Sequence, residues 1–301
     1  MSIPEGIYLI TNAKARIAVD LKDGLDKIGT PVQAWEEPKE TDLTLLNKLW
    51  LVQPTRRKDA QTYSICNLRS GTYMSLDKQN PTCVVGDYPE AFQFGEKPET
   101  LSQEWQFMKV GDSYRIKNAG SKTSLNLESG KDANGTPIIV WGDSDTTNQL
   151  WNLRSYSVSY DDIIAALQDS PYGMDDFKYY SLNTLYFVLP QPFMTQIWHA
   201  TPLPRRATNQ RLRPQIFSGD DYAIAFKAAV NEWAFENIKA NHFSPLCGVH
   251  VGERQNAVGD YYAYNWTLSE DRKTVLFFET KMNGPGRVME KIEYNAIWGL
   301  I

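Results

Sequence analysis

Cysteine and histidine are scarce in this chain. Its 301 residues contain three of each, and the cysteines at positions 66, 83 and 247 form no C-x-x-C pair. Cys66 and Cys83 have no histidine near them at the spacing of metal ligands. This scarcity excludes a disulfide-rich scaffold and a zinc finger.

Long hydrophobic runs and a strong charge of one sign are also missing. No apolar run approaches the roughly eighteen residues that cross a bilayer, and residues 1–20 show no basic segment followed by an apolar core. The net charge of −5 gives no reason for affinity to nucleic acid or to an anionic membrane. We therefore expect no nucleic-acid partner, no membrane insertion and no signal peptide, with a cytoplasmic or non-classically secreted location. The length and the hydrophobic content of 42% are sufficient for two globular domains.

The first half carries an internal repeat of three units. Each unit closes on a tryptophan, at positions 50, 105 and 151, and the motif Gly-Thr-Pro occurs at 29–31 and again at 135–137. Short apolar or alternating segments bounded by Gly, Asp, Asn and Pro predict about four short strands in each repeat. Three such repeats predict a closed, threefold all-β unit, in which closure removes exposed strand edges and the closing tryptophans form core.

This repeat resembles the ricin-type β-trefoil lectins over residues 1–154. The resemblance implies a shallow sugar pocket built from an Asp after the second strand, an aromatic platform and an Asn-Gln pair before the final Trp. A carboxylate accepts hydrogen bonds from neighbouring hydroxyls, and an aromatic ring packs on the apolar face of galactose. The implied carbohydrate-binding residues are Asp20, Gln33, Trp35 and Asn47 in repeat one and Asn126, Trp141, Asn148 and Gln149 in repeat three.

The three predicted pockets depart differently from that pattern. Repeat one has Lys48 where Gln is usual, and repeat three has Asn126 in place of the Asp. Repeat two keeps Gln103 but has Ser75 for the Asp and residues 87–88 where the ring should be, so we expect it to be degenerate. The alternative is structural: Asp20 forms a turn beside Asp23-Gly24, and Trp35 is core.

The second half changes to an α+β pattern. Ser159 and Asp162 predict a capped helix, and a longer helix with apolar residues at helical spacing begins near Asp220. Residues 261–266 and 274–279 then read as strands. Helices followed by strands indicate a separate α+β domain, which we place at residues 155–301.

That order resembles a papain-like cysteine protease domain, and the whole chain resembles the fungal chimerolectins. The matching stretches include LLNKLWLVQP, QIFSGDDYAIAFKAAV and AYNWTL. The resemblance implies a homodimeric agglutinin that binds galactose-type, including sialylated, glycans on glycoproteins or glycolipids. It also implies that the papain-like domain mediates dimerisation and that, in the family, this domain is a calcium-dependent protease.

The catalytic residues of the family are replaced here. Gly219 stands at the nucleophile position, Tyr262 stands at the base position, and Glu279 is kept at the third position. Without a thiolate and an imidazole there is no nucleophilic acyl transfer, so we expect no enzyme activity. Residues that could substitute for the missing groups are Ser218, Cys247, His199, His242 and His250.

Calcium is a further implication of the resemblance, although binding of sugar requires no cofactor. Asp220, Asp221 and Glu279 offer hard oxygen ligands of the kind that calcium prefers. Alternatively, the two aspartates only stabilise the positive end of the helix dipole. The sequence thus predicts a lectin with an inactive protease-like domain. Its alternatives are a hydrolase with an unrecognised nucleophile or a trefoil module that binds proteins.

Overall fold

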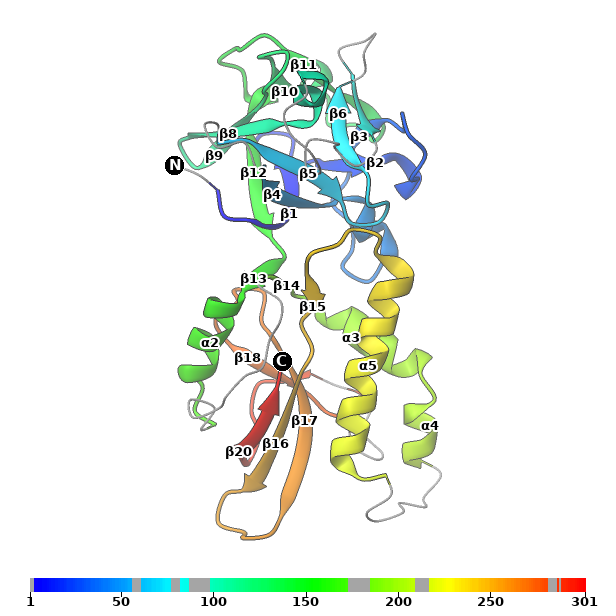
Figure 1. Ribbon diagram of the computed structural model, residues 1–301, viewed down its shortest axis with the longest axis vertical. Coiled ribbons are helices and arrows are strands. Elements are labelled where there is room, and N and C mark those ends of the chain that lie inside the picture. Colours follow the sequence, from blue (N-terminus) through cyan, green and yellow to red (C-terminus); the bar gives the residue numbers. More distant parts are fainter. Residues whose placement is uncertain are drawn as a thin grey trace. The chain divides into compact units, whose positions relative to one another are not determined.

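The computed structural model describes residues 3–55, 61–76, 82–86, 98–172, 185–208, 217–280, 286 and 288–301. Its contacts divide the chain into two compact units, shown in Figure 1. Unit 1 comprises Met1–Tyr156 with Ile238–Asn241, and unit 2 comprises Ser157–Asn237 with His242–Ile301. No helix among these described residues is both long and apolar enough to cross a membrane.

Unit 1 is built from short antiparallel strands. The strands are β1 (Gly6–Asn12), β2 (Ala18–Leu21), β3 (Val32–Trp35), β4 (Leu49–Pro54), β5 (Tyr63–Asn67), β6 (Tyr73–Leu76), β7 (Cys83–Gly86), β8 (Trp105–Val110), β9 (Ser113–Asn118), β10 (Ser124–Leu127), β11 (Thr136–Trp141) and β12 (Trp151–Ser155). Short 3-10 helices separate them: η1 (Lys22–Gly24), η2 (Leu43–Asn47), η3 (Pro98–Gln103), η4 (Glu128–Gly130) and η5 (Thr147–Gln149).

Six of these strands close into a barrel. β1 pairs with β4, β4 with β5, β5 with β8, β8 with β9, β9 with β12, and β12 returns to β1. The other strands form three hairpins, β2–β3, β6–β7 and β10–β11, one in each repeat. Unit 1 is therefore the β-trefoil that the repeat predicts, and closure satisfies the backbone groups of the barrel strands.

The three closing tryptophans occupy equivalent places in the core. Trp50, Trp105 and Trp151 are fully buried. Their indole N–H groups donate to the carbonyl oxygens of Val19, Met74 and Leu125, at 2.9, 3.1 and 3.0 Å. Each acceptor directly precedes one of the predicted polar positions, which are Asp20, Ser75 and Asn126. The core role predicted for these tryptophans is confirmed, and the shared bond makes the three polar positions structurally equivalent.

An asparagine at the end of the first strand of each repeat is a second shared feature, and the sequence analysis missed it. Each side-chain amide donates to backbone carbonyls just before a closing tryptophan, and each Oδ1 accepts from the N–H groups that follow it in the turn. These residues are Asn12, Asn67 and Asn118. All three are buried, and they tie the repeats together around the barrel.

Unit 2 is an α+β domain, as its sequence predicts. Its helices are α2 (Tyr160–Gln168), α3 (Gln191–Ala200), α4 (Leu203–Thr208) and α5 (Gly219–Asn237). Its strands are β13 (Ser157–Ser159), β14 (Leu185–Phe187), β15 (Ser244–Pro245), β16 (Gly248–Arg254), β17 (Tyr261–Leu268), β18 (Val275–Phe278), β19 (Val288–Met289) and β20 (Tyr294–Leu300). The larger sheet has the order β19-β18-β17-β16-β20, with β20 at one edge.

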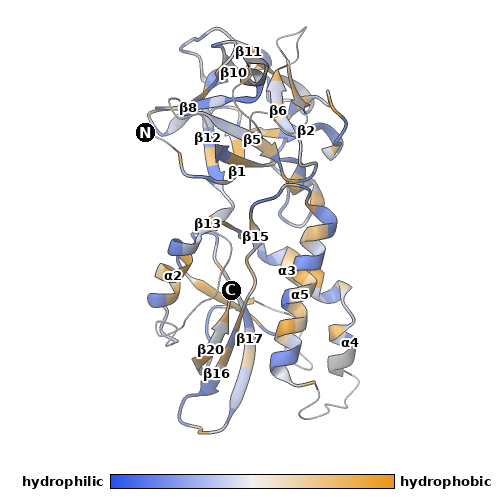
Figure 2. Ribbon diagram, viewed as in Figure 1, coloured by the Kyte–Doolittle hydropathy of each residue, from blue (hydrophilic) through white to orange (hydrophobic). Residues whose placement is uncertain are grey.

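Local sequence explains where α2 begins and how α5 packs. Ser159 and Asp162 form the predicted capping box at the start of α2. Along α5, hydrophobic and polar residues alternate, as Figure 2 shows, and its apolar side packs on β16 and β17. The buried Asn265 of β17 fixes this contact, because its side-chain amide donates to the carbonyl oxygens of Ala223 and Gly248 at 2.9 and 3.2 Å.

Candidate functional site

A pocket of about 720 Å³ opens in repeat one of unit 1. It contains all four residues that the sequence assigns to this repeat: Asp20, Gln33, Trp35 and Asn47. The other lining residues come from the turn after β2, the loop after β3 and the helix η2, namely Asp23, Glu36, Glu37, Pro38, Lys39, Thr41, Asp42, Thr44 and Lys48. Residues far apart along the repeat thus converge on one cavity.

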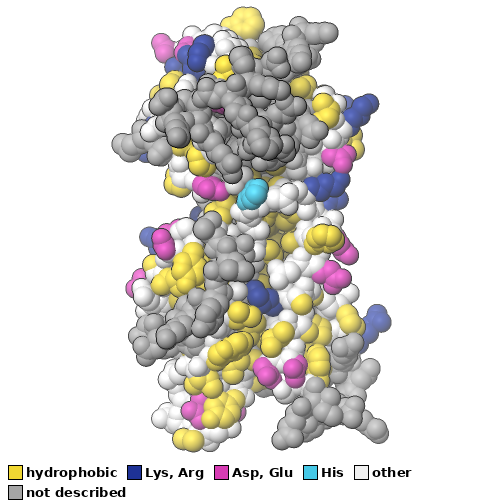
Figure 3. Space-filling view, in the orientation of Figure 1, with side chains coloured by type: hydrophobic (Ala, Val, Ile, Leu, Met, Phe, Trp, Pro, Cys, Tyr) yellow, Lys and Arg dark blue, Asp and Glu magenta, His cyan; other side chains and the backbone are white. Residues whose placement is uncertain are grey.

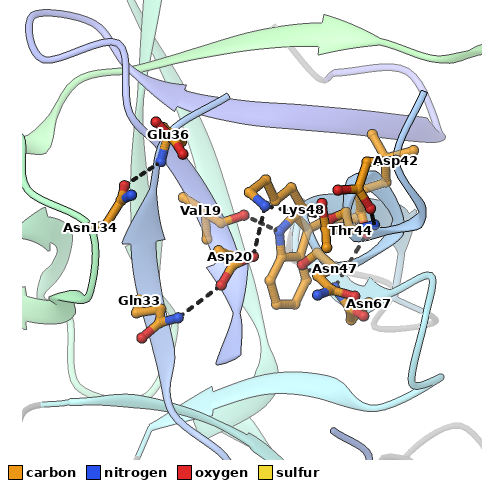
Figure 4. A network of polar contacts seen from close by, with 12 residues as sticks. Val19, Asp20, Gln33, Glu36, Asp42, Thr44, Asn47, Lys48, Asn67 and Asn134 are labelled. Atoms are coloured by element: carbon orange, nitrogen blue, oxygen red, sulfur yellow. Dashed lines mark hydrogen bonds and ion pairs between the residues drawn. The ribbon is translucent and has the colours of Figure 1, made fainter. Parts of the chain in front are cut away.

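Asp20 is the central acceptor of this pocket. It lies within β2 opposite Gln33 of β3, and only 3% of its surface is exposed. Gln33 Nε2 donates to one carboxylate oxygen at 3.0 Å, and Lys48 Nζ lies 3.3 Å from the other, as Figure 4 shows. Burial raises the pKa of Asp20, while the hydrogen bond from Gln33 and the charge of Lys48 oppose that rise. Since Asp20 belongs to a strand, the turn-forming alternative is wrong.

Lys48 is the least expected member of the site. It follows η2, which Asp42 caps by accepting the Thr44 N–H at 2.9 Å, and the Lys48 ammonium also donates to the Thr44 carbonyl at 3.5 Å. Its side chain is only 4% exposed. A lysine is rarely so buried unless it is paired, and here Asp20 supplies the partner. In the sequence, Lys48 stands out only as a departure from the pattern of the ricin-type lectins.

Trp35 supplies an open aromatic surface at the end of β3. The side chain is 36% exposed and lines the pocket, so the alternative that makes it a core residue is wrong. Next to it, the segment from position 36 to 42 contributes three carboxylates, which are Glu36, Glu37 and Asp42. These three lining residues were not predicted, although the acidic composition of the segment is a signal for them in the sequence.

In repeat three the predicted residues have other hydrogen-bond partners and other exposures than those of repeat one. Trp141 is 61% exposed at the end of β11, and Asn126 of β10 is buried, with its amide donating to the Leu127 carbonyl at 3.1 Å. Gln149 is fully buried: its Nε2 donates to the Gly142 carbonyl at 2.8 Å, and its Oε1 accepts the Ser144 N–H at 2.9 Å. Gln149 therefore holds the backbone beside Trp141.

Asn47 and Asn148 have the same place in their repeats. Each packs its side chain against a glycine of positive φ, Gly24 at +62° and Gly130 at +63°. In repeat two, the Ser75 hydroxyl is directed to the Leu76 carbonyl and to Ser102, at 3.3 and 3.4 Å. Residues 87 and 88 of that repeat lie outside the described residues, and Gln103 ends η3.

In unit 2, Gly219 lies close to the strand that carries Tyr262. Gly219 is the first residue of α5, and a Cβ placed on it would lie 3.9 Å from the backbone nitrogen of Ala263, the residue after Tyr262. Tyr262 is half-buried, with its ring 4.6 Å from that of Tyr264. Burial first, and then its charged and phenolic neighbours, including Glu279, raise the pKa of Tyr262. None of the residues Gly219, Tyr262 and Glu279 supplies a thiol or an imidazole.

The residues that could replace the missing groups have other roles or surroundings. Ser218 directly precedes α5: its N–H donates to Asp221 at 2.7 Å, and its hydroxyl donates to Asp220. Cys247 is buried, and burial raises the pKa of its thiol to about 12, which disfavours the reactive thiolate. Burial also disfavours the charged form of His250, and it lowers the pKa of that imidazole to about 4.

The remaining candidates do not gather into a site. His199 is exposed in the last turn of α3, and His242 is exposed with a positive φ. Among the described residues, no group of three or more His, Cys, Asp or Glu side chains is arranged to hold a metal ion. Asp220 and Asp221 are instead engaged by Ser218, so calcium at Asp220, Asp221 and Glu279 stays a prediction.

Comparison with known proteins assigns a family model to each unit. Residues 46–141 and 101–166 match the ricin-type beta-trefoil lectin domain-like model, and residues 186–284 match the agglutinin C-terminal model. A search of curated protein sequences finds no match.

Two solved structures are similar over their whole length. One is the Polyporus squamosus lectin bound to the human-type influenza-binding epitope Neu5Aca2-6Galb1-4GlcNAc, with 29% identity, complete coverage of both chains and a TM-score of 0.82. The other is described as a PSL1a–E64 complex, also with 29% identity and complete coverage of both chains, and with a TM-score of 0.80. The order of the two units and their folds are therefore those of these structures.

Proposed function

We propose that this chain, which shares the two-unit fold of the Polyporus squamosus lectin, is a carbohydrate-binding lectin for galactose-type glycans. The observation that carries this proposal is the pocket of repeat one. There a buried carboxylate, Asp20, lies in the same cavity as the exposed ring of Trp35. This pair is what recognition of a hexose requires.

The geometry of Asp20 suits recognition of hydroxyl groups. Gln33 and Lys48 each hold one carboxylate oxygen, and both oxygens keep lone pairs that can accept from sugar hydroxyls. The preset orientation of Asp20 reduces the entropy lost on binding. Trp35 then offers its face to the apolar side of the sugar ring. An analogue without the matching hydroxyl would leave buried polar groups unpaired, which is the basis of selectivity.

A second sugar site is proposed in repeat three. Trp141 is more exposed than Trp35, and Gln149 fixes the backbone next to it. Asn126 replaces the carboxylate by an amide, which both donates and accepts, so the preferred sugar is expected to differ from that of repeat one. Sialylated galactosides are candidate ligands of the protein, because the similar Polyporus squamosus lectin is bound to such a glycan in its crystal structure.

Unit 2 is proposed to be catalytically inactive. Gly219 brings no nucleophile to the start of α5, and Tyr262 brings a phenol with a raised pKa, which is a poor general base near neutral pH. The positions that the resemblance assigns to catalysis therefore supply neither a nucleophile nor a base.

We propose that unit 2 instead joins two copies of the chain. Its edge strand β20 carries Ile297 and Trp298, which are 55% and 45% exposed, and the neighbouring hairpin exposes Val258 and Tyr261. Figure 3 shows hydrophobic side chains gathered over this end of the unit. A homodimer would display each weak sugar site twice, and avidity would then allow the protein to agglutinate cells.

A glycan array with the purified protein tests the lectin function. It should be run beside Asp20→Ala and Trp141→Ala, and each variant should be checked for folding by circular dichroism. Selective signals for galactose-terminated or sialyl-galactose glycans, weakened by either substitution, are the expected result. An array without signal from folded protein would contradict the lectin function.

A further inference from the structure

The charges around the repeat-one pocket are unevenly balanced. Its lining includes five carboxylates, from Asp20, Asp23, Glu36, Glu37 and Asp42, and two ammonium groups, from Lys39 and Lys48. An ionised ligand entering the pocket would meet these groups at close range, where water screens their charges incompletely. The sign of the excess charge therefore affects which sugars the pocket accepts.

Two ion pairs offset the charge of some of these carboxylates, so fewer of them act on an incoming ligand. Lys48 is committed to Asp20, with both side chains almost fully buried. Glu37 is paired on the surface with Arg154, whose Nη2 lies 3.4 Å away. Among the residues that line the pocket, this leaves Asp23, Glu36 and Asp42 against Lys39, so the lining carries a net negative charge.

The buried lysine cannot serve an anionic ligand without a cost. A carboxylate on the sugar would have to draw the Lys48 ammonium away from Asp20, and it would leave that buried carboxylate without its partner. A neutral hydroxyl makes no such demand, because it can donate to Asp20 while the ion pair stays intact. Burial of the pair and the negative charge of the lining therefore act in the same direction.

We infer that the repeat-one pocket is selective for uncharged hexoses and rejects sugars that carry a carboxylate. This inference depends on the lectin function proposed above. It adds a charge selectivity that rests on the lining of the repeat-one pocket.

A matched series of ligands tests this selectivity on the full-length protein with Trp141→Ala, in which repeat three is disabled. Methyl β-galactoside, its 6-carboxylate (the galacturonoside) and its 6-amino-6-deoxy derivative share one ring and differ in charge at carbon 6. Affinities should be measured by NMR titration at low and at high salt. We expect the carboxylate to bind at least about tenfold more weakly than the neutral sugar at low salt, a difference of about 1.4 kcal/mol.

A charge-neutral variant separates charge from shape. Asp23→Asn, Glu36→Gln and Asp42→Asn remove three charges with little change in size, and Asn can still cap η2 and tolerate the positive φ at position 23. In this triple variant, and at high salt, the galacturonoside should come within about threefold of the galactoside. The matched control removes three exposed carboxylates from unit 2, with Glu232→Gln, Glu236→Gln and Glu270→Gln, and should leave the ratio unchanged.

The outcomes are distinct. Equal or tighter binding of the galacturonoside would overturn the charge selectivity while leaving the lectin function standing. The same holds if the tenfold ratio persists in the triple variant, because the discrimination would then arise from shape at carbon 6. If none of the three sugars binds, the sugar site of repeat one is itself refuted, and the selectivity falls with it.

Discussion

Repeats one and three build the same turn after their second strand. In repeat one Asp23 and Gly24 have φ values of 55° and 62°, and in repeat three Ser129 and Gly130 have 53° and 63°. Inside this common frame the side chains differ: Asp20 and Lys48 form a buried ion pair, whereas Asn126 and Gln149 bond to backbone. The comparison teaches that the backbone of a trefoil repeat is kept by a few structural residues, so its pocket can change without refolding.

The largest loss of stability is expected at the closing tryptophans, where repeats one and three are most alike. Trp50→Ala and Trp151→Ala each remove a fully buried indole and its hydrogen bond to a backbone carbonyl. Each should lower the free energy of unfolding by about 3–5 kcal/mol, and the two losses should agree within about 1 kcal/mol. Urea denaturation followed by tryptophan fluorescence measures both. A loss confined to one variant would show that the repeats are not equivalent in the core.

The next largest loss of stability is expected from the ion pair between Asp20 and Lys48, which repeat three does not have at the equivalent positions. Lys48→Gln gives repeat one the residue that repeat three has at position 149, and it leaves the buried Asp20 carboxylate with Gln33 but without a cation. The free energy of unfolding should fall by about 2 kcal/mol at pH 7, less than for complete loss of a buried partner, because Gln can still donate to Asp20.

The pH dependence of this variant follows from the direction of the Asp20 pKa. Burial already raises that pKa above its unfolded value, and loss of Lys48 raises it further. Because the folded state then binds a proton more readily than the unfolded state, the stability deficit should shrink as the pH falls through the folded pKa. Sugar binding, which needs the carboxylate, should weaken over the same range. Urea melts and galactoside titrations at pH 7.5 and 5 test both, and a deficit that grows on acidification would contradict this account.

A smaller, shared effect is expected at the turn glycines. Gly24→Ala and Gly130→Ala place a Cβ at positive φ and against the side chain of Asn47 or Asn148. Each should cost about 1–2 kcal/mol, because the strained backbone adds to the displacement of the asparagine. Thermal denaturation of both variants is the measurement, with Gly142→Ala as the control. Gly142 has no positive φ, and no atom lies within 4 Å of its Cβ position.

Much of this fold could be predicted from sequence, because its repeats leave a periodic signal. The closing tryptophans and Gly-Thr-Pro motifs predict the trefoil, and Ser159 with Asp162 predicts the start of α2. The tie made by Asn12, Asn67 and Asn118 was missed, since each bond reaches a carbonyl distant along the chain. Short-range patterns do not report such contacts.

The residues of the candidate site that belong to strands could be predicted from the sequence, whereas the residues of its surrounding loop could not. Asp20 and Trp35 hold fixed places in the repeat, whereas Glu36, Glu37 and Asp42 belong to an irregular loop whose course depends on tertiary contacts. The pairing of Lys48 with Asp20 is a further case, because the two residues are 28 positions apart and meet only when the repeat closes. Sequence alone identified the departure at Lys48 but gave no partner for it.

The smallest effect concerns the carboxylate–lysine pair of repeat three. Lys117 Nζ lies 2.6 Å from Asp143 Oδ2, and Asp143 also accepts a hydrogen bond from Ser124. The side chains of Lys117 and Asp143 are nevertheless 21% and 39% exposed. Water solvates both charges, so Asp143→Asn should lower the free energy of unfolding by less than about 1 kcal/mol. In repeat one, Asp20→Asn should cost more, because it leaves the buried ammonium of Lys48 without its charge partner. Urea denaturation of both variants at low and high salt measures the contrast. Equal costs would mean that burial, the feature that most separates the two repeats, does not set the strength of their ion pairs.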